Sequence, residues 1–259
     1  MYGPPNGPER IPQLTTQETN YMAPKPWQDA TVERITVETP ETKTFRLALP
    51  EPIDFVCGQY VNIRFEFPDK GRVQRAYSID SSPTDREFVD LTIRRIEDGT
   101  ISRHMCDEIE VGATVETRGP FGKFTWTPDD GGPLTLIGAG SGVVPLMCII
   151  RYCNDMGISD IPITLLFSSK SWEYIIHRDE LTEYESKMPN LEVIHTLTRE
   201  PDCDKVPYHR RIDQEMIAAH LPADPLCYLC GPPQMCEGAV SDLEALGVDP
   251  GRIFVEKYD

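Results

Sequence analysis

The chain has 259 residues, which fits one large domain or two medium ones, because a compact domain usually holds about 100–200 residues. Its 39% hydrophobic and 26% charged residues are typical of a soluble globular protein. With 25 Lys and Arg against 42 Asp and Glu, the net charge of −17 excludes broad nucleic-acid binding and argues against docking on anionic lipid. No apolar run approaches the roughly 18–20 residues of a membrane span, and no export signal opens the sequence, so we expect a cytoplasmic protein.

The acidity is uneven along the chain. Residues 1–128 hold 15 basic and 20 acidic residues, whereas residues 129–259 hold 10 and 22. If the second half binds a polyanionic ligand, its few cations must therefore be concentrated at that site.

The eight cysteines do not indicate a disulfide framework, because the chain is long and lacks an export signal. The only close set is Cys227, Cys230 and Cys236. Cys227 and Cys230 fall in an apolar strand-like run, where residues three apart point to opposite faces. This set chelates poorly, and we expect no metal or iron–sulfur site.

The first half is predicted to form a small barrel. Residues 1–27 are rich in Pro, Gly, Thr and Gln without periodicity, which predicts a mobile N-terminal arm. Short strand-like runs then follow, with one helix expected over residues 102–110. The runs cover residues 30–39, 43–50, 59–67, 75–80, 88–96 and 113–119. This rhythm predicts a six-stranded antiparallel β-barrel over residues 28–128.

The second half alternates strands and helices after a Pro-, Asp- and Gly-rich boundary at residues 127–132. The expected strands are residues 133–138, 163–169, 191–198, 225–231 and 252–258, and the expected helices are residues 144–156, 176–188, 213–220 and 235–246. Such alternation predicts a parallel sheet covered on both faces, here an α/β domain over residues 129–259.

A glycine-rich loop, Gly138-Ala139-Gly140-Ser141-Gly142-Val143-Val144-Pro145, joins the first of these strands to a helix. Glycines let a backbone approach a pyrophosphate, and a helix N-terminus offers free N–H groups to an anion. Pro145 is expected in the first helical turn, where it loses no hydrogen bond. A tight strand-to-helix turn with nothing bound explains the loop about as well.

The next strand ends in Ser168-Ser169-Lys170, without the acidic residue that usually holds a ribose 2′-hydroxyl. Hydroxyls and a cation there suit a 2′-phosphate better. Arg199 and the pair Arg210-Arg211 follow the third strand, although each could be an ordinary surface charge.

Two motifs in the barrel half could serve a flat anionic ligand. Arg75-Ala76-Tyr77-Ser78 combines a phosphate-binding fork, a stacking ring and a hydroxyl, although a plain edge strand explains these four residues alone. Gly99-Thr100-Ile101-Ser102 precedes the expected helix, with Ser102 read as its N-cap. The start of that helix is explained about equally well by a bound anion and by simple capping with nothing bound.

Two further motifs lie late in the chain. Cys230-Gly231-Pro232-Pro233-Gln234-Met235 stands at the carboxyl end of a strand, where open α/β sheets bind ligands. The terminal run Val255-Glu256-Lys257-Tyr258-Asp259 adds an acid and an aromatic ring.

Together and in this order, the motifs R-x-Y-S, G-x-x-S, G-x-G-x-G-x-x-P, C-G-P-P-x-M and V-E-x-Y resemble those of the ferredoxin–NADP⁺ reductase superfamily. The resemblance covers about residues 28–259. Within the superfamily the chain is most similar to bacterial stand-alone flavin reductase modules and to the reductase modules of oxygenase and hydrogenase systems.

The resemblance implies a role for each motif residue. Ser78, Cys230, Glu256 and Tyr258 would act at the meeting point of flavin and nicotinamide. The expected flavin-binding residues are Arg75, Ala76, Tyr77, Ser78, Arg94, Gly99, Ile101, Ser102 and Tyr258. The expected pyridine-nucleotide-binding residues are Gly138, Gly140, Gly142, Pro145, Ser168, Lys170, Arg199, Arg211, Cys230, Gly231, Pro232 and Met235.

The implied function is a flavoenzyme that passes a hydride from NAD(P)H to FAD and then single electrons to a redox protein. FAD is favoured over FMN by the terminal aromatic residue, and NADPH over NADH by Lys170, Arg199 and Arg211. The acceptor could be a ferredoxin, a flavodoxin or an oxygenase component. An acidic acceptor would need a basic patch on the barrel, around Arg72, Arg94, Arg95 or Arg103. The alternative is an electron-transfer or redox-sensing subunit of a larger complex with little activity alone, and a plain nucleotide-binding α/β protein explains only the second half.

Overall fold

The computed structural model describes residues 24–258. Most of the predicted N-terminal arm, residues 1–23, and Asp259 lie outside the described residues. The end of the arm contacts the barrel: Lys25 N donates to the Gly119 carbonyl (2.9 Å), and the Arg64 guanidinium lies 3.9 Å from the centre of the Trp27 ring.

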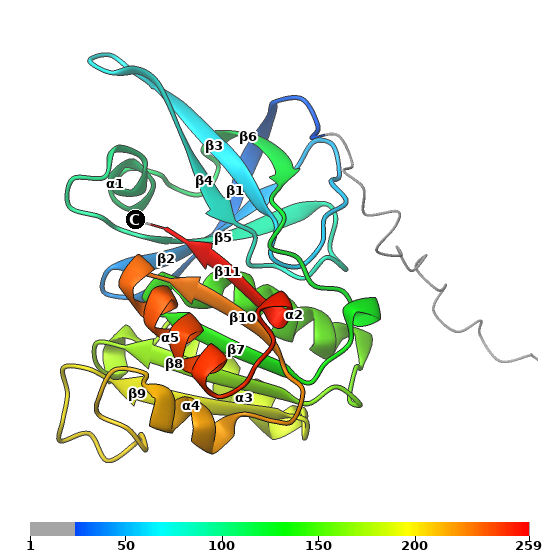
Figure 1. Cartoon of the computed structure of the whole chain (residues 1–259). Helices are drawn as coiled ribbons and strands as arrows, with labels where there is room; N and C mark the ends of the chain where they lie inside the picture. Colours follow the sequence, from blue (N-terminus) through cyan, green and yellow to red (C-terminus); the bar gives the residue numbers. More distant parts are fainter. Residues whose placement is uncertain (1–23, 259) are drawn as a thin grey trace, which may run out of the picture.

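The first half forms the predicted six-stranded antiparallel sheet (Figure 1). Its strands are β1 (Gln28–Thr39), β2 (Thr42–Ala48), β3 (Tyr60–Phe67), β4 (Gly71–Ser78), β5 (Phe88–Arg94) and β6 (Thr114–Phe121). They lie in the order β4-β3-β6-β1-β2-β5. Just beyond β4, Asp80 N donates to the Asp90 carbonyl (2.9 Å), so the two edge strands of the sheet are joined there.

The helix of the barrel begins earlier than the sequence indicates. Helix α1 spans Thr100–Asp107 and Gly99 is its N-cap, so the predicted start at Ser102 was wrong. The Ser102 hydroxyl instead accepts from the backbone N–H of Ile96 (3.2 Å) in the preceding loop. This side chain therefore closes the loop onto the helix rather than capping it.

The second half forms a five-stranded parallel sheet in the order β11-β10-β7-β8-β9. Its strands are β7 (Leu134–Ala139), β8 (Ile163–Ser169), β9 (Leu191–Leu197), β10 (Leu226–Gly231) and β11 (Ile253–Lys257). Its helices are α2 (Val143–Met156), α3 (Arg178–Lys187), α4 (Gln214–His220) and α5 (Pro233–Ala245), with 3₁₀ turns η1 (Pro128–Asp130), η2 (Gly140–Gly142), η3 (Trp172–Tyr174) and η4 (Pro250–Arg252).

The helices cover both faces of this sheet, as predicted. Residues of α2 and α3 share one buried cluster with the sheet, and residues of α4 and α5 share another on the opposite face. Cys230 belongs to the first cluster and Cys227 to the second, which confirms that their side chains point to opposite faces.

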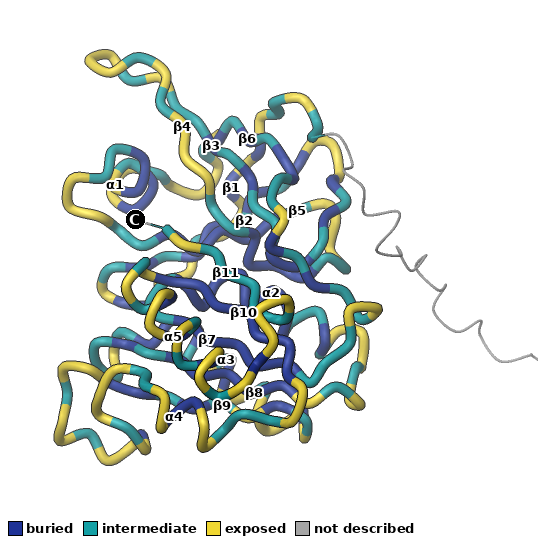
Figure 2. The backbone as a smooth tube through the Cα atoms, in the orientation of Figure 1, coloured by how far each residue is buried: buried dark blue, intermediate teal, exposed yellow. Residues whose placement is uncertain are grey.

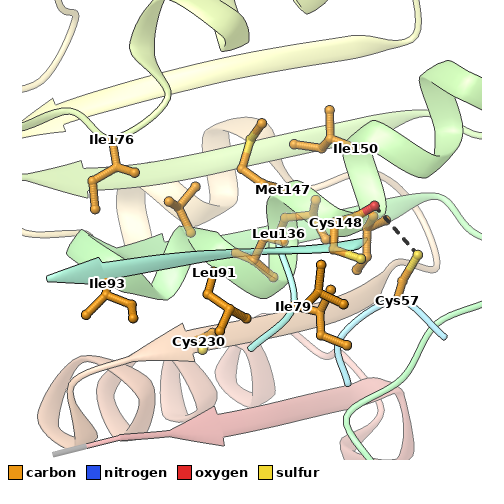
Figure 3. Packing of buried hydrophobic residues seen from close by; sticks show 14 of the residues in the cluster. Cys57, Ile79, Leu91, Ile93, Leu136, Met147, Cys148, Ile150, Ile176 and Cys230 are labelled. Carbon is orange, nitrogen blue, oxygen red and sulfur yellow. Dashed lines mark hydrogen bonds between the residues drawn. The ribbon is translucent and has the colours of Figure 1, made fainter. Parts of the chain in front are cut away.

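The core on the α2 side continues into the barrel (Figures 2 and 3). Ile79 and Leu91 of the barrel belong to the same buried cluster as Met147 and Cys148 of α2. Cys57 Sγ lies 3.6 Å from the Cys148 carbonyl oxygen. The shared apolar core fixes the barrel against the sheet. The crevice between the two domains therefore has a defined shape.

A buried ionic cluster joins the two halves beside this core. His177, the N-cap residue of α3, places Nε2 2.8 Å from an Asp80 carboxylate oxygen and Nδ1 3.1 Å from Glu38. Arg151 of α2 lies 2.8 Å from the other Asp80 oxygen and 2.7 Å from Glu180. Two barrel carboxylates are thus held by a histidine and an arginine of the sheet domain.

Candidate functional site

A cavity of about 640 Å³ lies between the barrel and the end of β11, within the volume range of small-molecule sites. We call it the barrel pocket. Its lining residues are Tyr60, Arg75, Ala76, Tyr77, Ser78, Thr92, Arg94, Ile96, Gly99, Ser102, Ser141, Val144, Glu256, Lys257 and Tyr258.

The edge strand β4 brings Arg75, Tyr77 and Ser78 to this pocket. Arg75 is exposed, and its guanidinium donates to the neighbouring Gln74 carbonyl (3.0 Å) and to no carboxylate of residues 24–258. Its guanidinium is therefore available to bind phosphate. Tyr77 packs against the core, and burial raises the pKa of its hydroxyl, so it stays neutral.

Glu256 reaches the pocket from β11, where it pairs in register with Cys230 of β10. The Ser78 hydroxyl donates to Glu256 Oε2 across the junction of the two domains (3.3 Å). Burial raises the pKa of the Glu256 carboxyl, and the hydrogen bond from Ser78 offsets part of that increase. A partly buried acid and hydroxyl thus share one wall of the pocket.

Cys230 and Tyr258 lie beside this pair. Cys230 is fully buried, and burial followed by the charge of Glu256 raises the pKa of its thiol well above the ordinary value. Such a thiol is unreactive. Tyr258 neighbours Cys230 and lines the barrel pocket, whereas Cys230 itself does not.

A second cavity of about 190 Å³, the crevice pocket, opens at the carboxyl ends of β7 and β8 against the β1–β2 turn. Its lining residues are Thr39, Glu41, Thr42, Arg94, Ala139, Gly140, Ser141, Ser168, Ser169, Lys170, Tyr174, Ile176, Thr198, Pro232 and Tyr258. Arg94, Ser141 and Tyr258 line both pockets, so the two cavities meet at these residues.

The glycine-rich loop forms the turn η2 between β7 and α2. Gly140 adopts a φ of +56°, a conformation that favours glycine, and it lines the crevice pocket. A Cβ on Gly142 would lie 2.0 Å from the Cys230 carbonyl oxygen, so this glycine is needed for packing on β10. Pro145 is the third residue of α2, in the first turn as expected.

The residues expected at a 2′-phosphate separate into two groups. Ser168 and Lys170 line the crevice pocket. Arg199 and Arg211 are exposed and do not line it, although the backbone N–H of Arg199 donates to the Lys170 carbonyl (2.8 Å). Lys170 Nζ is also paired with a Glu41 carboxylate oxygen at 3.2 Å.

The two pockets together bring most of the predicted site residues to one place. The predicted residues that line neither pocket are Ile101, Gly138, Gly142, Pro145, Arg199, Arg211, Cys230, Gly231 and Met235. Sequence reasoning gave no role to Tyr60, Thr92 and Glu41, or to Ser141 within the glycine-rich loop. Tyr60, Thr92 and Glu41 lie outside the motifs, so their local sequence gives no signal, whereas the position of Ser141 in the loop could have indicated it.

The arginines that an acidic acceptor would need on the barrel are paired with carboxylates. Arg95 and Arg103 both pair with Asp107, at 2.9 and 3.9 Å. Arg72 pairs with Glu66 and Arg94 with Glu41, each at 3.4 Å. These four arginines therefore present little net positive charge.

The donors present fit a flavin and a pyridine nucleotide. The barrel pocket offers an arginine without a carboxylate partner, an aromatic ring and the N-terminus of α1, which suit a dinucleotide with a planar ring. In the crevice pocket, the buried hydroxyl of Ser169 has no hydrogen-bond partner among residues 24–258. An unpaired buried hydroxyl is costly and indicates a polar ligand group nearby.

Comparison with known proteins identifies both halves. Residues 29–126 match the oxidoreductase FAD-binding domain, and residues 136–241 match the oxidoreductase NAD-binding domain. The chain is 31% identical over 231 residues to the ferredoxin–NAD(P)⁺ reductase component of naphthalene 1,2-dioxygenase/salicylate 5-hydroxylase systems from a Ralstonia species, covering 88% of this chain and 68% of the relative. The chain belongs to the ferredoxin–NADP⁺ reductase superfamily.

Other members of the superfamily support the same assignment. NADH-cytochrome b5 reductase 1 of Lodderomyces elongisporus is 33% identical over 217 residues, covering 80% of this chain and 71% of the relative. The crystal structure of a cytochrome P450 reductase from Amycolatopsis superposes with a TM-score of 0.79 at 28% identity, covering 90% of this chain and 69% of that one. The protein is an NAD(P)H-dependent flavoprotein reductase that transfers electrons from NAD(P)H through FAD to an acceptor.

Proposed function

We propose that the chain is the reductase of a bacterial-type oxygenase or related electron-transfer system, delivering electrons to a redox protein. The observation that carries this proposal is the shared boundary of the two pockets at Arg94, Ser141 and Tyr258. A flavin in one pocket and a nucleotide in the other would meet there. FAD, when bound, accepts a hydride and releases electrons singly.

The protein supplies binding, alignment and protection from water. Arg75 would bind the flavin phosphates, Tyr77 would lie against the flavin ring, and the start of α1 would receive the pyrophosphate. Ser78 and Glu256 would hold a hydrogen bond and a proton beside the reacting ring. Tyr258 would cover the ring face until nicotinamide displaces it.

The nucleotide preference stays a prediction. Ser168 and Lys170 support NADPH because both line the crevice pocket. The pairing of Lys170 with Glu41 opposes this preference, and the relative from Lodderomyces elongisporus is named for NADH. The ratio of kcat/KM for NADPH and NADH decides between them, and a ratio of one or less excludes the NADPH preference.

The acceptor is proposed from the named relatives. A reductase component of propane 2-monooxygenase from Mycolicibacterium goodii is 26% identical over 259 residues, covering 96% of this chain and 73% of the relative, and together with the Ralstonia relative it favours a ferredoxin or an oxygenase component. Because Arg72, Arg94, Arg95 and Arg103 are paired with carboxylates, a strongly acidic partner gains little steering from them. No helix within residues 24–258 is long and apolar enough to cross a membrane, and a cytoplasmic location stays a prediction.

The second candidate is a subunit with little activity alone, and one experiment separates the two. The purified chain, loaded with FAD, is mixed with NADPH or NADH and an artificial one-electron acceptor. Sustained reduction of the acceptor supports the reductase. Reduction of the bound flavin without turnover would instead favour a subunit that works only within a complex.

A further inference from the structure

The β1–β2 turn of the barrel places a carboxylate in the crevice pocket. Glu41 follows Pro40 in the tight turn between Thr39 and Thr42, which are paired in register. Its backbone is fixed on both sides: Glu41 N donates to Thr39 Oγ1 (3.3 Å), and the Glu41 carbonyl accepts from Arg95 N (2.7 Å). The side chain is therefore delivered to the pocket by a rigid hairpin.

The Glu41 carboxylate spans the crevice between the two domains. One oxygen, Oε2, lies 3.2 Å from Lys170 Nζ at the end of β8 and 3.4 Å from Arg94 Nε at the end of β5. Partial burial raises the pKa of Glu41, but Lys170 and Arg94 together lower it below the ordinary value. Glu41 thus stays ionised and balances the cation that a 2′-phosphate would use.

We infer that Glu41 is a specificity-determining residue that disfavours a 2′-phosphorylated pyridine nucleotide. The inference rests on the proposed binding of NAD(P)H in the crevice pocket. A 2′-phosphate at Lys170 must either share that cation with Glu41 or displace the carboxylate, and in both cases two anions face each other at close range. A 2′-hydroxyl meets no such repulsion, and it can hydrogen-bond to a carboxylate or to the unpaired Ser169 hydroxyl of the same pocket.

The absolute preference of the enzyme and the effect of Glu41 are separate quantities. Lys170 favours the 2′-phosphate and Glu41 opposes it, so the ratio of kcat/KM for NADPH and NADH reports their balance. Removing the Glu41 charge shifts this ratio toward NADPH whichever nucleotide the native enzyme prefers.

The test compares Glu41→Gln with three references. Glu41→Asp keeps the charge, Lys170→Met removes the cation, and Glu33→Gln removes an exposed charge of β1, the strand that leads into the turn. Glu41→Gln should raise the NADPH/NADH ratio of kcat/KM about tenfold, because it removes a like-charge repulsion at a partly exposed site. Lys170→Met lowers the ratio, and Glu41→Asp and Glu33→Gln leave it within about twofold of the native value. FAD content is measured in every variant.

A binding measurement without flavin chemistry completes the test. Dissociation constants are measured by calorimetry for adenosine 2′,5′-bisphosphate and adenosine 5′-monophosphate, which differ only in the 2′-phosphate. Glu41→Gln should lower the dissociation constant for the bisphosphate and leave that for the monophosphate unchanged. Equal changes for both ligands, or the same shift in Glu33→Gln, would overturn the role of Glu41. If the native chain oxidises neither nucleotide and binds neither ligand, the proposed function fails instead.

Discussion

Ser78 of the barrel donates a hydrogen bond to Glu256 of the last strand, with 3.3 Å between Oγ and Oε2. The two residues belong to different domains, so the contact forms only when the domains are packed together. It places a carboxyl group with a raised pKa at the edge of the barrel pocket, which Ser78 and Glu256 both line.

Replacing either member should change the pH dependence of flavin reduction. Because Ser78 lowers the pKa of Glu256, Ser78→Ala should shift to higher pH the limb of the pH–rate profile on which the rate falls as Glu256 loses its proton. Glu256→Gln should remove that limb and slow the reaction about tenfold or more. Stopped-flow measurement of flavin reduction by saturating nucleotide, repeated across the pH range, gives the rate and the pH dependence of each variant. Ser186→Ala removes an exposed hydroxyl of α3 and should leave the profile unchanged.

Arg75 should account for much of the retention of FAD. Arg75→Gln removes a charge-assisted contact to phosphate, worth about 1.5–3 kcal/mol, so the dissociation constant for FAD should rise about 10- to 100-fold. Arg72→Gln is the matched control, because Arg72 lies on the same strand and pairs with exposed Glu66. Fluorescence titration of the apoprotein gives both constants, and equal effects would contradict the assignment of Arg75.

Tyr258 divides the two pockets and should limit nucleotide binding. Tyr258→Ala joins the cavities, so an oxidised nucleotide no longer has to displace the ring, and its dissociation constant should fall about tenfold. Tyr258→Phe keeps the ring and should bind the oxidised nucleotide as tightly as the native chain does. Weaker binding to Tyr258→Ala would show that the ring supports the nucleotide instead of blocking it.

His177 should make stability depend on pH. Burial alone would lower its pKa, but Asp80 and Glu38 overcome both this and the repulsion of Arg151, and raise the pKa to about 9. Because the folded pKa exceeds the unfolded value, this stabilisation is complete below about pH 6.5 and is lost as the pH rises through 9. Urea midpoints should therefore fall over that interval.

The His177→Gln variant checks this origin. It leaves Asp80 partly uncompensated in the interior and should cost about 3–5 kcal/mol of unfolding free energy at neutral pH, with a flatter pH dependence. His209→Gln, at an exposed position, should behave as the native chain. If the stability of His177→Gln fell with rising pH as steeply as that of the native chain above neutral pH, another group would be responsible for the pH dependence.

The sequence predicted the architecture because local patterns carry it. Alternation indicated the barrel strands, and the buried runs of residues 163–169 and 225–231 indicated parallel strands. The start of α1 was misplaced because Ser102 is a strong N-cap residue in isolation, whereas its hydroxyl here bonds back to the Ile96 N–H. Glu41 gave no signal, because a turn glutamate becomes part of a nucleotide pocket only through the docking of another domain.

The central claim is that a flavin in the barrel pocket and a pyridine nucleotide in the crevice pocket meet at Tyr258, beside Ser78 and Glu256. Its most direct test is an anaerobic titration of the FAD-loaded chain with NADPH and with NADH, followed by the visible absorbance of the flavin. The account predicts that about one equivalent of at least one nucleotide bleaches the flavin. A chain that retains no FAD after reconstitution, or whose bound FAD stays oxidised with both nucleotides, would contradict it.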